Sequence, residues 1–284
     1  MTATLPPLIS AADLQHLLAS GASVLLLDCG FDLADPAAGE RAYATGHLPG
    51  ALYAHLDRDL SGAKATPTDA LGRHPLPQRA AFADTAATWG LAPGLRVVTY
   101  DAQGGPYAAR AWWLLRWLGH AEVQVLDGGV AAWQAHGGTL TTQTTPPPSA
   151  TAPYPTDGPA GMPTLNADAL QARLGQVLLL DARAAERFRG DVEPLDPVAG
   201  HIPGATNRFF KHNLQADGRF KPAADLRTEF TALGSGAVVH QCGSGVTACH
   251  NLLAMAAAGL DAGTLYPGSW SGWCAEASRP VARG

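Results

Sequence analysis

The chain has 284 residues, of which 46% are hydrophobic and 15% charged, and its formal net charge is −5. This length suits two domains better than one, and the hydrophobic fraction supplies a sizeable core, which excludes a chain that is disordered throughout. The mildly acidic balance, without a basic stripe, argues against a protein that binds nucleic acid or an anionic membrane surface.

Neither the start of the chain nor its cysteines suggest export. No Lys or Arg precedes an apolar run in residues 1–23, so we expect no secretory signal, and no apolar run is long enough to cross a membrane. The four cysteines, Cys29, Cys242, Cys249 and Cys274, are widely spaced and form no CxxC pair, which is unlike a disulfide framework. We therefore expect a soluble, cytoplasmic protein whose cysteines are thiols.

Short apolar runs alternate with amphipathic runs along the chain. The apolar runs resemble strands buried on both faces, for example residues 24–27 and 96–100. The amphipathic runs predict helices, namely residues 11–18, 79–89 and 108–118. This alternation predicts the α/β class, with mostly parallel sheets flanked by helices.

The second half of the chain repeats the plan of the first. Val24-Leu-Leu-Leu-Asp28 is followed by Gly46-His-Leu-Pro-Gly-Ala51, and the same order recurs from Val177-Leu-Leu-Leu-Asp181 to Gly200-His-Ile-Pro-Gly-Ala205. Each copy continues with a strand, a loop of small residues, a helical run and a glycine turn before a tryptophan. Such ordered self-similarity indicates two copies of one domain.

A segment rich in Thr, Pro, Ser and Ala separates the two copies. It covers residues 139–163, and its prolines remove backbone donors and disfavour both helix and strand. We therefore predict an N-terminal domain over residues 1–138, an extended linker over 139–163 and a C-terminal domain over 164–284.

Cys242 stands where a parallel sheet would bind a ligand. It follows a predicted strand, residues 234–241, and precedes Gly243-Ser244-Gly245 and a helix from about residue 246. A loop with such small side chains can point its backbone N–H groups at an anion, at the positive end of the next helix, and so favour a thiolate. The spacing alone leaves a buried structural cysteine as an alternative. Structural roles are expected for the other three cysteines.

The segment Cys242-Gly-Ser-Gly-Val-Thr-Ala-Cys-His250 resembles the active-site loop of 3-mercaptopyruvate sulfurtransferases, which belong to the rhodanese superfamily. Both Gly-His-hydrophobic-Pro-Gly blocks, Asp181-Ala-Arg183 and Ala111-Trp-Trp113 are similar to that superfamily too, so the resemblance spans about residues 8–273. The related thiosulfate sulfurtransferases carry basic residues after the cysteine, where this chain has glycine and serine. The resemblance implies two tandem rhodanese-like domains with one nucleophile, because Asp101 stands where the second copy has Cys242.

The chemistry implied by the resemblance is sulfur transfer through a persulfide of Cys242. The sulfur donor would be 3-mercaptopyruvate, or alternatively thiosulfate, and the acceptor a thiol or cyanide. No metal or organic cofactor is implied. A thioredoxin-like reductant is a candidate partner, and we expect the chain to act as a monomer.

The resemblance also implies a Ser-His-Asp relay beside the cysteine. Ser244 matches the serine, His74 in His74-Pro-Leu-Pro77 matches the histidine, and Asp57 matches the acid, with Asp59 as the alternative. For His74 and Asp57, an ordinary place on an exposed loop is the competing interpretation. The loop positions implied in substrate binding are Gly243, Gly245, Val246 and Thr247.

Two arginines bind the substrate carboxylate in the family that the chain resembles. Arg187 matches the first, whereas Leu195 stands at the expected position of the second. Losing such a charge-assisted contact costs about 1.5–3 kcal/mol. Arg189 or Arg208 could substitute, although a surface role is the competing interpretation for each.

Two other functions remain open from the sequence. Phosphatases with rhodanese-like domains close a longer loop with arginine, but residues 243–250 contain none, so a phosphoryl group would lack its clamp. The second alternative is a non-catalytic persulfide carrier or regulatory module that docks on another protein.

Overall fold

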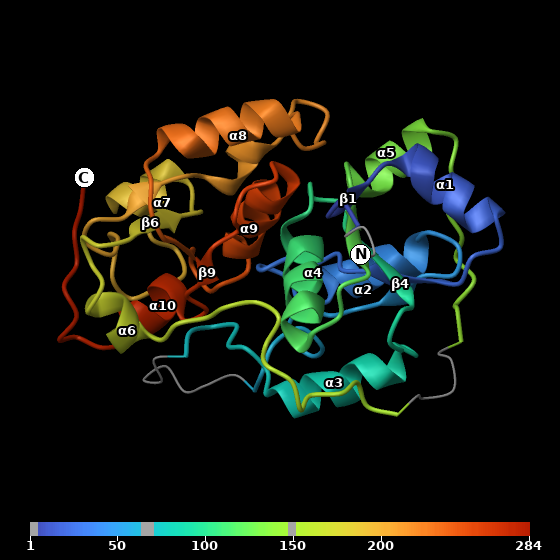
Figure 1. The fold of residues 1–284 in the computed structure, drawn as a ribbon, viewed down its shortest axis with the longest axis horizontal. Helices are drawn as coiled ribbons and strands as arrows, with labels where there is room; N and C mark the ends of the chain where they lie inside the picture. Colours follow the sequence, from blue (N-terminus) through green and yellow to red (C-terminus); the bar gives the residue numbers. More distant parts are fainter. Residues whose placement is uncertain (1–4, 64–70, 147–151) are drawn as a thin grey trace. The chain divides into compact units, whose positions relative to one another are not determined.

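The structure is a computed structural model that describes residues 5–63, 71–146 and 152–284, and it separates into two compact units (Figure 1). Unit 1 comprises Met1–Leu60, Pro77–Met162 and Ala216–Phe220, and unit 2 comprises Ser61–Leu76, Pro163–Gln215 and Lys221–Gly284. The division is therefore not a single cut. A segment from the first half of the sequence belongs to unit 2, and a short segment from the second half belongs to unit 1.

Unit 1 contains a five-stranded sheet in the order β1-β5-β4-β2-β3, and every strand pair is parallel. Its strands are β1 (Leu8–Ile9), β2 (Val24–Asp28), β3 (Leu52–Tyr53), β4 (Arg96–Tyr100) and β5 (Val123–Leu126). Its helices are α1 (Ala11–Ala19), α2 (Ala38–Thr45), α3 (Arg79–Thr88), α4 (Pro106–Leu118) and α5 (Gly129–Ala135).

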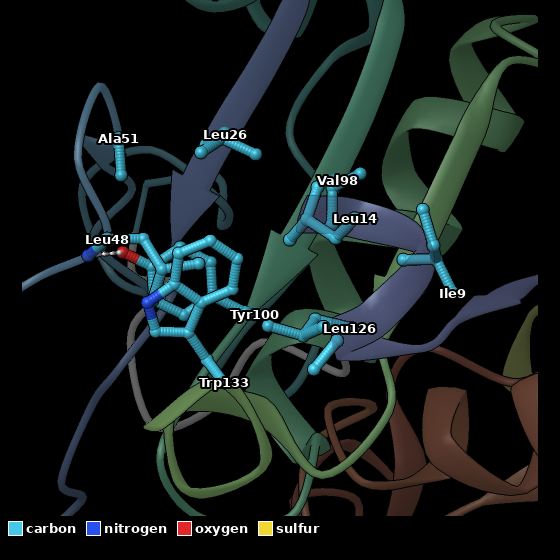
Figure 2. Packing of buried hydrophobic residues seen from close by; sticks show 10 residues of the cluster. Ile9, Leu14, Leu26, Leu48, Ala51, Val98, Tyr100, Leu126 and Trp133 are labelled. Atoms are coloured by element: carbon cyan, nitrogen blue, oxygen red, sulfur yellow. Dashed lines mark hydrogen bonds between the residues drawn. The ribbon is translucent and has the colours of Figure 1, made fainter. Parts of the chain in front are cut away.

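The core of unit 1 lies between its sheet and two helices. Figure 2 shows Leu14 of α1 and Trp133 of α5 beside Leu26 and Val98 of the central strands. Strands of this kind are apolar throughout because helices cover both faces of a parallel sheet. The amphipathic character expected of α4 is wrong, since all of its residues except two are buried. It packs against β4, β5 and α3, so no broad face of the helix is left to water.

Unit 2 contains a four-stranded parallel sheet in the order β7-β6-β8-β9. Its strands are β6 (Leu178–Asp181), β7 (Thr206–Asn207), β8 (Val238–Gln241) and β9 (Thr264–Leu265). Its helices are α6 (Ala167–Gln171), α7 (Ala185–Arg189), the 3-10 helix η1 (Phe210–Asn213), α8 (Ala223–Ala232), α9 (Ala248–Ala257) and α10 (Ser269–Trp273). This strand order matches β3-β2-β4-β5 of unit 1, so the sequence repeat is a structural repeat and the predicted α/β class is confirmed.

Helices cover both faces of the unit 2 sheet. Leu170 of α6 and Trp270 and Trp273 of α10 join Leu179 and Val239 of the strands in one buried cluster. Helix α9 packs against β8 and β9, and α8 lies against α9. No helix in the described part of the chain is long and apolar enough to cross a membrane.

Two sequence predictions concern the connections. In the described parts of 139–163 there is no helix or strand beyond an isolated bridge between His47 and Thr141, while residues 147–151 of the predicted linker lie outside the described residues. Helix α9 begins at Ala248 rather than near residue 246. The difference arises because Gly245 has a φ of +79°, which interrupts helical geometry.

Candidate active site

The Cys242 thiol lies directly beyond β8, a central strand of unit 2, with 2% of the residue exposed. Its Sγ accepts a hydrogen bond of 3.1 Å from the backbone N–H of Gly245. Within the described residues, the N–H groups of Gly243, Ser244, Val246 and Thr247 make no hydrogen bond. The loop therefore surrounds the sulfur with backbone donors, which is an arrangement suited to an anion.

Helix α10 holds this loop in place. The N–H of Cys242 donates to Ser269 Oγ at 3.0 Å. The N–H groups of Trp270 and Ser271 donate to the carbonyls of Cys242 and Gly243, each at 2.9 Å. Ser269 is fully buried and has a φ of +52°, a conformation rarely adopted by residues other than glycine. Sequence reasoning missed Ser269, and its neighbour Gly268 was the only local sign of a special turn.

Gly245 is required by the conformation of the loop. Its φ of +79° disfavours any side chain, and a Cβ there would lie 2.5 Å from the carbonyl oxygen of Pro267. Gly243 differs, since a Cβ at that position would meet only the ends of two arginine side chains. The two glycines thus serve different purposes within one loop.

His74 lies against Ser244, with 2.7 Å between its Nδ1 and the serine Oγ, and both residues are 5% exposed. His74 belongs to the segment Ser61–Leu76, which is part of unit 2. That segment is fixed to α10, because the N–H of Arg73 donates to Ser271 Oγ at 3.1 Å and a Cβ on Gly72 would clash with the Gly268 carbonyl at 2.5 Å. Tertiary structure therefore brings together two residues that are 170 positions apart.

Asp57 belongs to unit 1 and is half-buried, and its pairing with His74 stays a prediction. The alternative acid, Asp59, is used within its own turn. Its carboxylate accepts hydrogen bonds from the N–H of His55 at 2.7 Å and from Nε of Arg58 at 3.3 Å. This local role leaves Asp57 as the better candidate of the two.

Arg187 projects from α7, which follows β6, the neighbour of β8. Its Nη2 donates to Glu193 Oε1 at 2.6 Å and to Asp196 Oδ2 at 3.4 Å. Leu195, between these two acids, is 44% exposed. Arg187 is therefore fixed by two carboxylates next to the cysteine loop, whose Gly243 lies beside its guanidinium.

The arginines that could replace the missing one are engaged elsewhere. Arg189 is half-exposed and pairs with Asp191 at 2.7 Å. Arg208 is buried and pairs with Glu229 at 2.6 Å, so the surface role considered for it is wrong. The cation that does lie at the loop is Arg73, which forms an ion pair with Asp196 and which sequence reasoning missed. Its place next to the predicted His74 was the one available signal.

The remaining cysteines are buried, and none of the four forms a disulfide. Burial raises the pKa of Cys274 to about 11 and the pKa of Cys29 well above its usual value, so both stay protonated thiols near neutral pH. Cys249 in α9 donates through its Sγ to the carbonyl of Gly245 at 3.4 Å. These environments agree with the structural roles expected for the three.

The fold, the tandem repeat and the cysteine loop define a two-domain α/β protein with one thiol site. A model of the rhodanese-like domain matches residues 10–136 and 166–276. The chain is 49% identical over 285 residues to "Probable 3-mercaptopyruvate sulfurtransferase" of Pseudomonas aeruginosa, covering 98% of each chain. It is 31% identical to the thiosulfate sulfurtransferase of Gallus gallus, covering 89% of this chain and 87% of the relative.

A solved structure agrees with these relatives. The 3-mercaptopyruvate sulfurtransferase from Leishmania major superimposes with a TM-score of 0.81 at 31% identity, covering 93% of this chain and 73% of that one. The chain therefore belongs to the rhodanese family.

Proposed function

We propose that the protein is a sulfurtransferase that moves sulfur from 3-mercaptopyruvate to a thiol or cyanide acceptor through a persulfide on Cys242. The observation that carries the proposal is the Cys242 loop, in which the sulfur accepts a hydrogen bond from Gly245 N–H and lies among further backbone donors. The relative from Pseudomonas aeruginosa, similar along almost the whole chain, supports the choice of donor.

The first half-reaction transfers the donor's sulfur to the enzyme. The Cys242 thiolate attacks the thiol sulfur of 3-mercaptopyruvate, so that an S–S bond forms and the C3–S bond breaks. The bonding pair leaves with the pyruvate enolate. The donor's thiol proton ends on C3 of pyruvate, and the enzyme keeps an anionic persulfide, which the loop N–H groups stabilise.

The His74–Ser244 pair is the proposed proton carrier of this step. Its 2.7 Å contact joins an imidazole nitrogen to a hydroxyl two residues beyond Cys242, so a proton can pass between donor sulfur and C3 without leaving the site. Asp57 is the proposed residue that orients the imidazole.

The second half-reaction restores the enzyme. An acceptor thiol gives up its proton and attacks the outer sulfur of the persulfide, the S–S bond breaks, and Cys242 returns as a thiolate. Cyanide attacks in the same way and leaves as thiocyanate. A thioredoxin-like dithiol is a suitable acceptor because its second thiol can release the transferred sulfur as hydrosulfide while a disulfide forms.

Thiosulfate is the second candidate donor, because the relative from Gallus gallus is a thiosulfate sulfurtransferase and guanidinium groups bind sulfonate as well as carboxylate. A comparison of kcat/KM for the two donors decides between them. We expect 3-mercaptopyruvate to be preferred, since neither Gly243 nor Ser244 adds a charge after the cysteine. A preference for thiosulfate would overturn the donor and leave the persulfide step standing.

The nucleophile is tested with a matched pair of variants. Cys242→Ser should abolish turnover and the gain of one sulfur atom in the protein's mass after donor is added without acceptor. Cys274→Ser, which alters another buried thiol of unit 2, should keep both. If the protein gained sulfur and turned over donor without Cys242, the proposed mechanism would be wrong. If the wild type gained no sulfur from either donor, a docking module would be the better interpretation.

A further inference from the structure

Two guanidinium groups of unit 2 meet at Gly243, the residue that follows Cys242. A Cβ built on Gly243 would lie 3.0 Å from Nη2 of Arg73 and 3.4 Å from Nη1 of Arg187. The two amino groups therefore face one small volume beside the thiol. Any side chain at position 243 would take up part of that volume.

The amino groups that face this volume are those without another partner. Arg73 donates through Nη1 to Asp196, and Arg187 donates through Nε and Nη2 to Glu193 and Asp196. Neither Nη2 of Arg73 nor Nη1 of Arg187 hydrogen-bonds to any of the described residues. Each arginine is thus anchored on one side and keeps a charged donor on the other.

The anchors are more deeply buried than the arginines they hold. The side chains of Asp196 and Glu193 are each 3% exposed, whereas those of Arg73 and Arg187 are 28% and 18% exposed. Asp196 contacts both guanidinium groups, one through each carboxylate oxygen, and so sets their spacing. Two carboxylates offset two guanidinium charges, so an anion is held mainly by directed N–H donors rather than by net charge.

We propose that Arg73 supplies the second guanidinium that binds the carboxylate of the sulfur donor, in place of the arginine that Leu195 replaces. This inference rests on the proposed function, since 3-mercaptopyruvate presents a carboxylate two carbons from its thiol-bearing carbon. The carboxylate accepts one hydrogen bond from Arg73 Nη2 and one from Arg187 Nη1, over Gly243. The raised KM expected from Leu195 alone is then offset by an arginine from a distant segment.

The inference is tested with Arg73→Gln and the matched control Arg189→Gln, which removes an exposed arginine of α7. Kinetics are measured with 3-mercaptopyruvate and with mercaptoacetone, a donor that has a methyl group in place of the carboxylate. We expect Arg73→Gln to lower kcat/KM for 3-mercaptopyruvate roughly 10- to 100-fold, chiefly through KM, as the loss of one charge-assisted contact predicts. Its kcat/KM for mercaptoacetone should stay near that of the wild type.

Binding of pyruvate, measured by calorimetry, separates this inference from the proposed function. Arg73→Gln should weaken pyruvate binding by a similar factor, and Arg189→Gln should not change it. If the wild type fails to use 3-mercaptopyruvate yet binds pyruvate in an Arg73-dependent way, the donor assignment fails and the anion site stands. Equal loss with both donors, or unchanged pyruvate affinity in Arg73→Gln, would overturn the site.

Gly243→Ala provides a second variant if Arg73→Gln does not fold. Gly243 lies outside the left-handed region, so alanine fits its backbone, and the added methyl group reaches only the two guanidinium groups. The same rise in KM for 3-mercaptopyruvate, without one for mercaptoacetone, is expected. An unchanged KM for both donors would count against the site.

Discussion

Gly245→Ala is the most informative single change in the cysteine loop. Gly245 has a φ of +79°, and its N–H donates to Cys242 Sγ at 3.1 Å. An alanine there would place a methyl group 2.5 Å from the carbonyl oxygen of Pro267, which is backbone and cannot turn away. The loop must therefore move, and the N–H that stabilises the sulfur moves with it.

The size of the effect follows from these contacts. A left-handed alanine costs about 1–2 kcal/mol, which destabilises the loop without unfolding a domain of this size. A hydrogen bond to a charged group contributes about 1.5–3 kcal/mol. Because the persulfide and thiolate need that bond during the reaction, kcat should fall roughly 10- to 150-fold.

The assay compares Gly245→Ala with Gly243→Ala in steady-state turnover of 3-mercaptopyruvate, with circular dichroism as the check on folding. Gly245→Ala should lower kcat, while Gly243→Ala should act mainly on KM, since its methyl group meets arginine side chains instead of backbone. A Gly245→Ala enzyme with the kcat of the wild type would refute the role given to this N–H.

Two further predictions concern unit 1. Burial raises the pKa of Asp28 from 3.8 to about 6, so the folded protein holds this proton more tightly than the unfolded chain. Its contribution to stability is complete below pH 3.8 and is lost as the pH rises through 6, by about 3 kcal/mol. The difference in unfolding free energy between wild type and Asp28→Asn, from urea titrations at about pH 4 and about pH 7, should change by that amount; a difference independent of pH contradicts it. Asp101→Ala should destabilise the protein by about 3 kcal/mol or more, because the buried carboxylate accepts four backbone hydrogen bonds, from Gln103, Gly105, Tyr107 and Ala108. An unchanged urea midpoint would show that water replaces those bonds without loss.

The Asp101 loop also explains why the first repeat needs no thiol. Its carboxylate lies where the second repeat has Cys242, and backbone N–H groups of the following loop and of α4 surround it. An anion that belongs to the chain thus fills the position that a bound sulfur takes in unit 2. The substitution was visible in the sequence, but its effect on the loop donors was not.

The sequence by itself determined the repeat, the parallel α/β class and the cysteine loop. These features depend on residues that are close along the chain: apolar runs form buried strands, and Cys242 with Gly243 and Gly245 defines a strand–loop–helix turn. The loop's small side chains and its one nucleophile are local properties, so the order of residues along the chain is enough to predict them.

Only the tertiary structure decided which distant residues complete the site. The segment Ser61–Leu76 packs with unit 2, which places His74 on Ser244 and Arg73 beside Gly243. Sequence reasoning searched for the second arginine near Arg187 because spacing reports only neighbours along the chain. Contacts between segments depend on how the whole unit buries its apolar surface, and no local pattern records that outcome.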